Sequence, residues 1–364
     1  MGNYYSMDSS ALRKFYKGKN ILITGHSGFK GSWLCRWLEL LGSRVSGMSL
    51  RPETNPSHFE VLYKNGRQSD YWQDIRLKNK VKEIFDKVNP EIVFHLAAQP
   101  SVIESYRNPL ETIETNIVGS GNILKAAYEN PYTQIVIVIT TDKCYENKEW
   151  LYPYRENDEL GGHDIYSSSK ACVELLTRAW QRSFCSLKEN GTAIASARAG
   201  NVIGGGDWTA DRLVVDLIKS RYTGSELQIR SPESTRPWQH VLEPLSGYLQ
   251  LAMKISADKT LASSYNFGPD ISSNLSTLEL INLFASIDKK YPRNPRKNNP
   301  EFHEASLLMV DSSKAKAILN WKPIFNVQDS VKLTETWYKN FYQKNRLITD
   351  EQIDLYMQRI PNVH

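Results

Sequence analysis

Short apolar runs alternate with amphipathic stretches along the first 200 residues of the chain. The run at 134–140 carries five apolar, β-branched residues in succession, from Ile135 to Ile139. A continuous run of this kind is typical of a parallel strand that is buried on both faces. Between such runs, apolar residues recur at helical spacing. The pattern predicts strands at 20–24, 44–50, 69–73, 91–95, 134–140 and 192–198, and helices at 29–41, 77–88, 108–130 and 166–187.

Strands that alternate with helices predict an α/β fold with a doubly wound parallel sheet. The pattern changes after Gly200, where glycines and prolines mark irregular chain and helical stretches follow without a second series of strands. We therefore expect a smaller, mixed C-terminal lobe that closes over the carboxyl edge of the sheet. The segment 265–268 is expected to return to the sheet, and residues 1–18 to form an extension on the surface. The helices of the lobe are predicted near 211–222, 243–254, 278–291, 312–319 and 327–342.

A glycine-rich turn follows the first predicted strand. Gly25, Gly28 and Gly31 are each separated by two residues, and a helical pattern begins at once. In a dinucleotide-binding turn, the first glycine allows the turn, the second lets a diphosphate approach the backbone, and the third lets the helix pack on the strand. The free N–H groups at the start of the helix would then hold the phosphates, with Ser27 and Phe29 beside them. Taken alone, the same spacing also occurs in turns that bind nothing.

Tyr166 and Lys170 form a Y-x-x-x-K pattern at the start of a predicted helix. Residues four apart lie on the same face of a helix. A phenol with a pKa of ~10 is a poor base at neutral pH, and a neighbouring ammonium group favours its ionised form. An isolated pair of this kind is usually two surface side chains. Here it follows a central strand in a chain with a dinucleotide turn, so we interpret Tyr166 as a catalytic base and Lys170 as its partner.

The glycine turn, His95-Leu96-Ala97-Ala98 and the Tyr166–Lys170 pair together resemble the extended short-chain dehydrogenase/reductase family. The resemblance implies a Rossmann NAD-binding domain at 19–200, to which 238–268 returns, and a nucleotide-sugar-binding lobe at 201–237 and 269–364. It places the third catalytic residue, which carries a hydroxyl, at Thr141. The further cofactor contacts that it implies are Asp74, Ile75, Leu96, Ala97 and Ala98.

Asp142 and Lys143 follow Thr141 directly. Oxidation of an alcohol needs only Tyr166, Lys170 and a hydroxyl, so an added acid and base indicate a second chemical step. The Asp-Lys pair and the stretches 142–150, 198–208 and 236–245 resemble the CDP-glucose 4,6-dehydratases within the family. The resemblance implies CDP-glucose as substrate, with oxidation at C4, loss of water across C5–C6 and hydride return to C6. Without the long matches, Asp142 and Lys143 could equally be an ion pair on a solvated turn.

The resemblance also implies which side chains hold the substrate. Arg236 matches the diphosphate-binding arginine of the family, and a guanidinium fork suits phosphate oxygens. No metal-binding spacing is present. Weaker candidates in the lobe are Arg198, Asn201, Trp208, Arg212, Arg230 and His303.

The composition narrows the classes of protein to which this chain can belong. The 364 residues carry a formal net charge of +5, and the 45 basic residues are scattered rather than clustered, which argues against nucleic-acid binding. No apolar run approaches the ~20 residues that a membrane span needs. The four cysteines form no C-x-x-C pair, so we expect reduced thiols in a cytoplasmic protein. The resemblance implies a homodimer, through helices 108–130 and 166–187, or a homotetramer.

Some alternatives stay open at this point. Ser49-Leu50-Arg51 stands where many NAD enzymes have an acid at the end of strand two, and Arg51 could meet the 2′-phosphate of NADP. The similar dehydratases also lack that acid, so we expect NAD. A 4,6-dehydratase of another nucleotide hexose, a nucleotide-sugar 4-epimerase and a non-catalytic NAD-sensing protein remain alternatives. The identity of the nucleotide base rests on the resemblance alone.

Overall fold

The computed structural model describes residues 9–185, 191–293, 295–298 and 306–360. Its centre is a parallel sheet of seven strands in the order β11-β6-β5-β4-β1-β2-β3. The order reverses between β1 and β4, which pair directly, as expected for a doubly wound sheet. The predicted return of 265–268 is confirmed, because β11 pairs with β6 along its whole length. The strands are β1 (Asn20–Thr24), β2 (Arg44–Ser49), β3 (Asp70–Trp72), β4 (Ile92–His95), β5 (Ile135–Ile139), β6 (Ala193–Ala199) and β11 (Ser264–Phe267).

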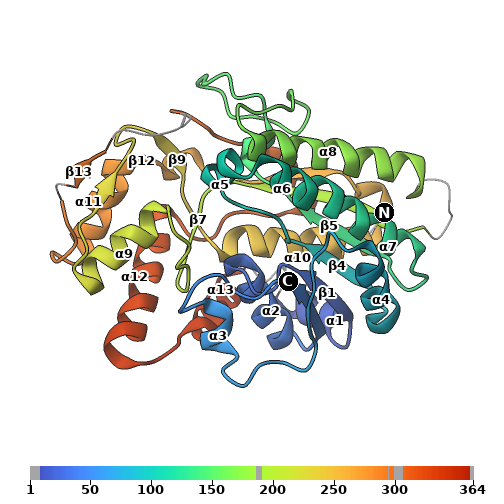
Figure 1. The fold of residues 1–364 in the computed structure, drawn as a ribbon. Coiled ribbons are helices and arrows are strands. Elements are labelled where there is room, and N and C mark those ends of the chain that lie inside the picture. The colour runs from blue at the N-terminus through green and yellow to red at the C-terminus, as the bar shows by residue number, and fades with distance from the viewer. Residues whose placement is uncertain (1–8, 186–190, 294, 299–305, 361–364) are drawn as a thin grey trace.

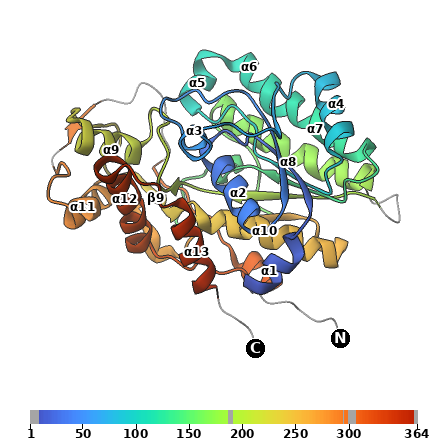
Figure 2. The ribbon, with the colours of Figure 1, turned by 90° about the horizontal axis from the view of Figure 1, so that it is seen from below.

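Both faces of the sheet are buried beneath helices (Figures 1 and 2). Alternate residues of each strand point to opposite faces, and both sets are apolar, which explains the continuous runs in the sequence. Leu22, Val93 and Val136 meet one layer of helices, while Ile23 and Ile137 meet the other. The first layer is α4 (Lys78–Val88), α7 (Gly119–Glu129) and α8 (Ile165–Ser183), and the second is α1 (Ser9–Tyr16), α2 (Phe29–Leu40) and α10 (Leu242–Ala257).

The N-terminal segment corrects one prediction, since part of the expected surface extension is a packed helix. In α1, Leu12 and Tyr16 are fully buried, and the Tyr16 hydroxyl donates to the carbonyl of Leu249 on α10 at 2.8 Å. Leu12 and Tyr16 are four residues apart and therefore share one face of the helix. That apolar pair was the sequence signal for a docked helix. The division into domains is otherwise untested and stays a prediction.

The predicted helix at 108–130 is broken into pieces. A π-helical turn, η1 (Glu114–Val118), separates α6 (Pro109–Ile113) from α7, and α5 (Val102–Arg107) precedes them. Such turns often mark functional sites. Asn116 on η1 accepts from the backbone N–H of Gln99 and donates to the Ser169 hydroxyl, both at 2.8 Å. The π turn thus ties the end of β4 to the helix that carries Tyr166.

The C-terminal lobe is helical, with three short strand pairs (Figure 1). It also holds a helix that the sequence analysis missed, α13 (Thr349–Arg359), which packs against α2 and buries Tyr356. No helix within the described ranges is both long and apolar enough to cross a membrane. The other elements are α3 (His58–Leu62), α9 (Leu213–Thr223), α11 (Thr277–Ile287), α12 (Val327–Lys344), the π turn η6 (Ala315–Leu319), and the strand pairs β7 (Val202–Ile203) with β10 (Gln239–His240), β8 (Gln228–Ile229) with β13 (Arg296–Lys297), and β9 (Thr235–Pro237) with β12 (Asn274–Ser276).

Candidate active site

The glycine turn joins β1 to α2 at the carboxyl edge of the sheet, next to the reversal of strand order. Gly25 has φ +73°, and a Cβ there would lie 2.7 Å from the backbone nitrogen of Ala97. A Cβ on Gly31 would lie 2.1 Å from the carbonyl oxygen of Gly25. Both positions therefore need glycine, one for its conformation and both for close packing. Gly28 differs, because it is exposed at the N-cap of α2 and a Cβ there would meet only the Gly25 oxygen, at 3.4 Å.

The space over Gly28 is what a diphosphate requires. The site is open, the backbone N–H groups of the first turn of α2 face it, and a side chain at Gly28 would fill it. Ala97 donates its backbone N–H to the Thr24 hydroxyl, which fixes the Leu96-Ala97-Ala98 segment beside the turn. Phe29 packs partly buried against the core. These residues fit a dinucleotide cofactor.

At the adenosine end of this site, the polar residues that the structure describes are bonded to one another. Ser27 is bonded to the Ser49 hydroxyl and the Leu50 carbonyl, both at 2.8 Å. The Arg51 guanidinium lies over the Trp72 ring, 4.9 Å from its centroid. The carboxylate of Asp74, a predicted cofactor contact, accepts hydrogen bonds from the backbone N–H and the guanidinium of Arg76. Ile75 is buried against Gly119. The cofactor contacts of Asp74 and Ile75 stay predictions.

The catalytic candidates lie one strand away, where β5 ends. Thr141 caps the short 3₁₀ helix η2 (Asp142–Cys144), and its hydroxyl donates to Asp142 Oδ1 at 3.0 Å. The second carboxylate oxygen of Asp142 is buried and has no hydrogen-bond partner in the described part of the chain. Lys143 is half-buried on the same turn. The turn thus presents an acid and an amine beside a hydroxyl.

Tyr166 and Lys170 face this turn from the start of α8. The phenol of Tyr166 hydrogen-bonds the Thr141 hydroxyl, and Lys170 Nζ lies 3.5 Å from the carbonyl oxygen of Ile139. The structure therefore brings together Thr141, Asp142, Tyr166 and Lys170, which the sequence spaces over thirty positions. Asp164 caps α8 by accepting from the Ser167 backbone N–H, which fixes the start of the helix.

The ionisation of Tyr166 differs from what the spacing predicts. Burial raises the pKa of Tyr166 to about 12, and the carboxylates of Asp142 and Asp164 add to the rise, against the Thr141 hydrogen bond and the Arg212 charge. Burial lowers the pKa of Lys170 to about 8, with Glu174 and Cys144 opposing it. In the chain alone burial therefore dominates the ionisation of Tyr166, and the positive charge of an oxidised nicotinamide bound beside the phenol would lower this pKa.

Similarity to known proteins agrees with this arrangement. Residues 22–334 match the model of the GDP-mannose 4,6 dehydratase family. The chain belongs to that family. It is 40% identical over 333 residues to the CDP-glucose 4,6-dehydratase of Salmonella typhimurium, covering 90% of this chain and 92% of the relative. It is 25% identical over 344 residues to the dTDP-glucose 4,6-dehydratase of Haemophilus influenzae, covering 88% and 97%.

Solved structures show the same fold at lower identity. An epimerase from Methanothermobacter thermautotrophicus superposes with a TM-score of 0.80 at 19% identity, covering 95% of this chain and 97% of that one. A Thermus thermophilus UDP-glucose 4-epimerase in complex with NAD gives 0.72 at 21% identity, covering 88% and 98%. The fold and the family that the motifs predicted are both confirmed.

Two of the predicted substrate-binding residues, Arg198 and Trp208, lie away from the catalytic turn. Arg198 is 1% exposed and is paired with Glu174 inside the protein, because the alternation along β6 turns it toward α8. Trp208 is 7% exposed, packs on the rings of α12 and bonds the Tyr342 hydroxyl at 3.1 Å. Its edge lines a hollow of about 470 Å³ whose lining includes none of the catalytic candidates. Neither residue is placed to hold substrate at the catalytic turn.

The remaining candidates are Arg212, Arg236, Asn201, Arg230 and His303. Arg212 is ion-paired with Asp207 at 2.6 Å, and its charge acts on Tyr166. Arg236 donates to the carbonyls of Thr235 and Ser306. Asn201 follows β6 and is half-buried, Arg230 reaches the Asp211 carbonyl, and His303 lies outside the described residues. The substrate roles of Asn201, Arg212, Arg230 and Arg236 stay predictions.

Lys30 is a residue that the sequence analysis overlooked. It sits in the first turn of α2, and its ammonium group is influenced by Asp142, Lys170 and Arg212. Burial, Arg212 and Lys170 lower the pKa of Lys30 to about 8, against the effect of Asp142. The glycine turn therefore carries a cation toward the catalytic residues. A lysine between the second and third glycines of a predicted dinucleotide-binding turn was the available signal.

The remaining polar residues near the edge are structural. His95 lies between the Thr24 and Ser120 hydroxyls at 2.6 and 2.8 Å, and burial lowers its pKa to about 3. His26 is buried against Asp70 at 3.2 Å. Cys144 is fully buried, and burial raises the pKa of its thiol, so it is not a nucleophile.

Proposed function

We propose that this chain catalyses the NAD-dependent conversion of CDP-glucose to CDP-4-keto-6-deoxyglucose with loss of water. The observation that carries the proposal is the Asp142–Lys143 turn. Asp142 lies beside the Thr141–Tyr166 pair and Lys143 follows it on the same turn, where a simple alcohol oxidation would need neither an added acid nor an added amine. Identity of 40% to a curated CDP-glucose 4,6-dehydratase over nearly the full length supports the choice of nucleotide.

The first half of the reaction falls to Tyr166, Thr141 and Lys170. NAD held at the glycine turn would supply the acceptor for the hydride of C4 and the donor of that hydride to C6. Tyr166 takes the proton of the C4 hydroxyl. Thr141, which is hydrogen-bonded to the phenol of Tyr166, orients the oxygen of that C4 hydroxyl. Lys170 keeps positive charge beside the developing phenolate.

The second half falls to the turn after β5. A ketone at C4 acidifies the C5–H bond, and Lys143 in its neutral form removes that proton. Asp142 protonates the leaving C6 hydroxyl, so that water departs, and a proton returns to C5 as hydride reaches C6. Asp142 is 1% exposed, and its second carboxyl oxygen has no hydrogen-bond partner in the described part of the chain, which leaves that oxygen open to the leaving hydroxyl. The net change is the loss of one water molecule from each sugar.

The direct test is incubation of the purified protein with CDP-, dTDP-, GDP- and UDP-glucose. We expect a 4-keto-6-deoxy product from CDP-glucose, detected by mass spectrometry as the loss of water, and little from the others. Asp142→Asn is the matched control, because an epimerase has no use for an acid at C6 and would keep its activity. Absence of product from CDP-glucose, or C4 inversion without loss of water, overturns the proposal.

We also propose that the protein forms a homodimer through α6, η1 and α8. Leu110, Val118 and Leu175 are 73%, 53% and 52% exposed on these adjoining helices, which is unusual for clustered large apolar side chains. Changing all three to Glu should give a folded monomer by analytical ultracentrifugation, where the unchanged chain sediments as a dimer. Leu151→Glu, at an exposed leucine in the loop before α8, is the control and should leave the mass unchanged. A dimer that survives the triple change places the interface elsewhere.

A further inference from the structure

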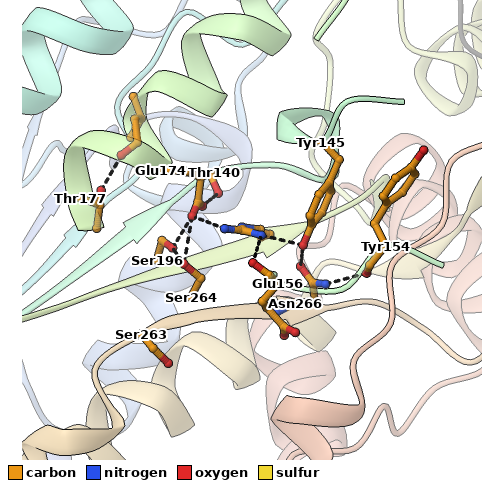
Figure 3. A network of polar contacts seen from close by, with 12 residues as sticks. Thr140, Tyr145, Tyr154, Glu156, Glu174, Thr177, Ser196, Ser263, Ser264 and Asn266 are labelled. Carbon is orange, nitrogen blue, oxygen red and sulfur yellow. Dashed lines mark hydrogen bonds and ion pairs between the residues drawn. The ribbon is translucent and has the colours of Figure 1, made fainter. Parts of the chain in front are cut away.

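A buried ion pair lies beneath the catalytic turn and joins α8 to β6 (Figure 3). Arg198 Nη2 is 2.7 Å from Glu174 Oε2, and the two side chains are 1% and 0% exposed. A pair removed from water in this way persists only where its remaining polar atoms are satisfied. Glu174 also accepts hydrogen bonds from the hydroxyls of Thr140, Ser196 and Ser264.

The pair touches the chain on both sides of the catalytic turn. Thr140, which donates to Glu174, comes directly before Thr141. Tyr145, whose hydroxyl accepts from Arg198 Nη1 at 2.7 Å, comes directly after Cys144. The four residues 141–144 are therefore held between two contacts to one buried pair. Figure 3 shows both contacts converging on the space between α8 and the sheet.

The contact at Tyr145 continues into the loop before α8. The Tyr145 hydroxyl donates to Asn266 on β11 at 2.8 Å, and Asn266 donates to the carbonyl of Tyr154 at 2.9 Å. Arg198 also donates to the carbonyl of Glu156 at 3.3 Å. The pair thus fastens the loop that leads from the catalytic turn to Tyr166.

Glu174 has a second effect, through charge. It lies one helical turn beyond Lys170 on α8, and its carboxylate opposes the lowering of the Lys170 pKa by burial. The other groups that interact electrostatically with Lys170 are Cys144 on η2, His95 on β4 and Lys30 on α2. Among these described neighbours Glu174 is the carboxylate that keeps Lys170 charged.

We propose that Glu174 and Arg198 are positioning residues for the catalytic turn, and that Glu174 also maintains the charge of Lys170. This inference rests on the proposed function, since it takes Thr141, Tyr166 and Lys170 as the catalytic groups. The pair itself touches neither substrate nor cofactor. Its effect is on the geometry of residues 141–144 and on the pH range of activity.

The positioning effect is tested with Tyr145→Phe, which removes one hydroxyl and keeps the ring. We expect kcat to fall about tenfold while KM changes little, because the turn loses one of its two anchors. Thr177→Val is the matched control. Thr177 lies on α8, as Glu174 does, and its buried hydroxyl donates to the carbonyl of Val173. Unchanged kcat in Tyr145→Phe, or an equal loss in Thr177→Val, overturns this part.

The charge effect is tested with the double variant Glu174→Gln/Arg198→Met. Either single change leaves a buried charge unpaired and can prevent folding, whereas removing both charges is often tolerated. We expect the alkaline limb of the kcat profile to move to lower pH by roughly one unit, because Lys170 loses its neighbouring carboxylate. A folded double variant with the original profile and kcat overturns the inference.

A readout independent of turnover separates this inference from the proposed function. The pH dependence of Lys170 acylation by a small reagent, followed by mass spectrometry, reports the Lys170 pKa directly. If the unchanged protein dehydrates none of the nucleotide sugars, the proposed function fails, and the acylation profile still decides the effect of Glu174. An identical profile in the double variant then overturns that effect.

Discussion

Tyr166→Phe should abolish formation of product from CDP-glucose. The phenol is the group placed to take the C4 hydroxyl proton, and its partners Thr141 and Lys170 cannot replace it, since one is a weak acid and the other is needed as a cation. Loss of a positioned base typically costs 10²–10⁴-fold, and here both halves of the reaction depend on it, so we expect a loss of about 10³–10⁴-fold. The measurement is turnover under saturating substrate.

The structure offers a control for this substitution. Tyr152 is a strongly exposed tyrosine in the loop before α8, and Tyr152→Phe removes a phenol that has no part in the site. Tyr166→Phe should bind the substrate with nearly unchanged affinity and keep its melting temperature within a few degrees. Retention of more than about a tenth of the activity would remove Tyr166 from the role of base.

The elements of the α/β sheet were predictable because each carries its own signal. The run Ile135–Ile139 is apolar on both faces, and that pattern predicts a central strand without knowledge of its neighbours. Helix α13 carried a comparable signal that was not used, since Ile353, Tyr356 and Met357 recur at helical spacing. The π turn in the helix at 108–130 had no such signal, because it depends on the packing of Asn116 against α8.

The candidate site was predictable where its residues are neighbours in sequence. Tyr166 and Lys170 share a helix face by spacing alone, and Thr141, Asp142 and Lys143 are consecutive. Arg198 was misplaced because a sequence does not show which way a strand residue points. Its partner Glu174 is 24 positions away, and an arginine inside an apolar strand indicates only that some buried partner exists.

The ionisation of the site depends on tertiary structure. The Tyr166–Lys170 spacing predicts a phenol whose ionised form is favoured by the ammonium group together with oxidised nicotinamide, and in the chain alone burial dominates and raises the pKa of Tyr166 to about 12. Lys30 was missed for the same reason, because its approach to Asp142 depends on how α2 packs against the end of β5. Both features depend on how deeply the site is buried in the folded protein, which no local sequence pattern shows.

Lys143→Met should separate the two halves of the reaction. Oxidation at C4 needs Tyr166, Thr141 and Lys170, and none of these is Lys143. Removal of the C5 proton needs a base, and Lys143 is the amine on the turn that follows β5, next to the acid Asp142. Methionine keeps a similar length and loses the amine, so the geometry of the turn should survive.

The expected result is an enzyme that still oxidises the sugar at C4 but does not complete the loss of water. A nucleotide sugar oxidised at C4 that still carries its C6 hydroxyl should accumulate, up to one per active site, in quenched samples analysed by mass spectrometry. The near-ultraviolet absorbance of reduced nicotinamide should rise with it, and release of 4-keto-6-deoxy product should fall by about 10²–10⁴-fold. Exchange of the C5 proton with heavy water should be lost to the same degree.

Lys148→Met is the matched control, because Lys148 is an exposed lysine in the same loop, 3.1 Å from Glu159 and over the Trp150 ring. It should dehydrate CDP-glucose at the original rate. If Lys143→Met forms no oxidised sugar, then Lys143 acts in binding or oxidation, and the base for C5 must be sought elsewhere. Lys30 would be the next residue to test, since its pKa of about 8 leaves part of it neutral near physiological pH and its charge acts on Asp142.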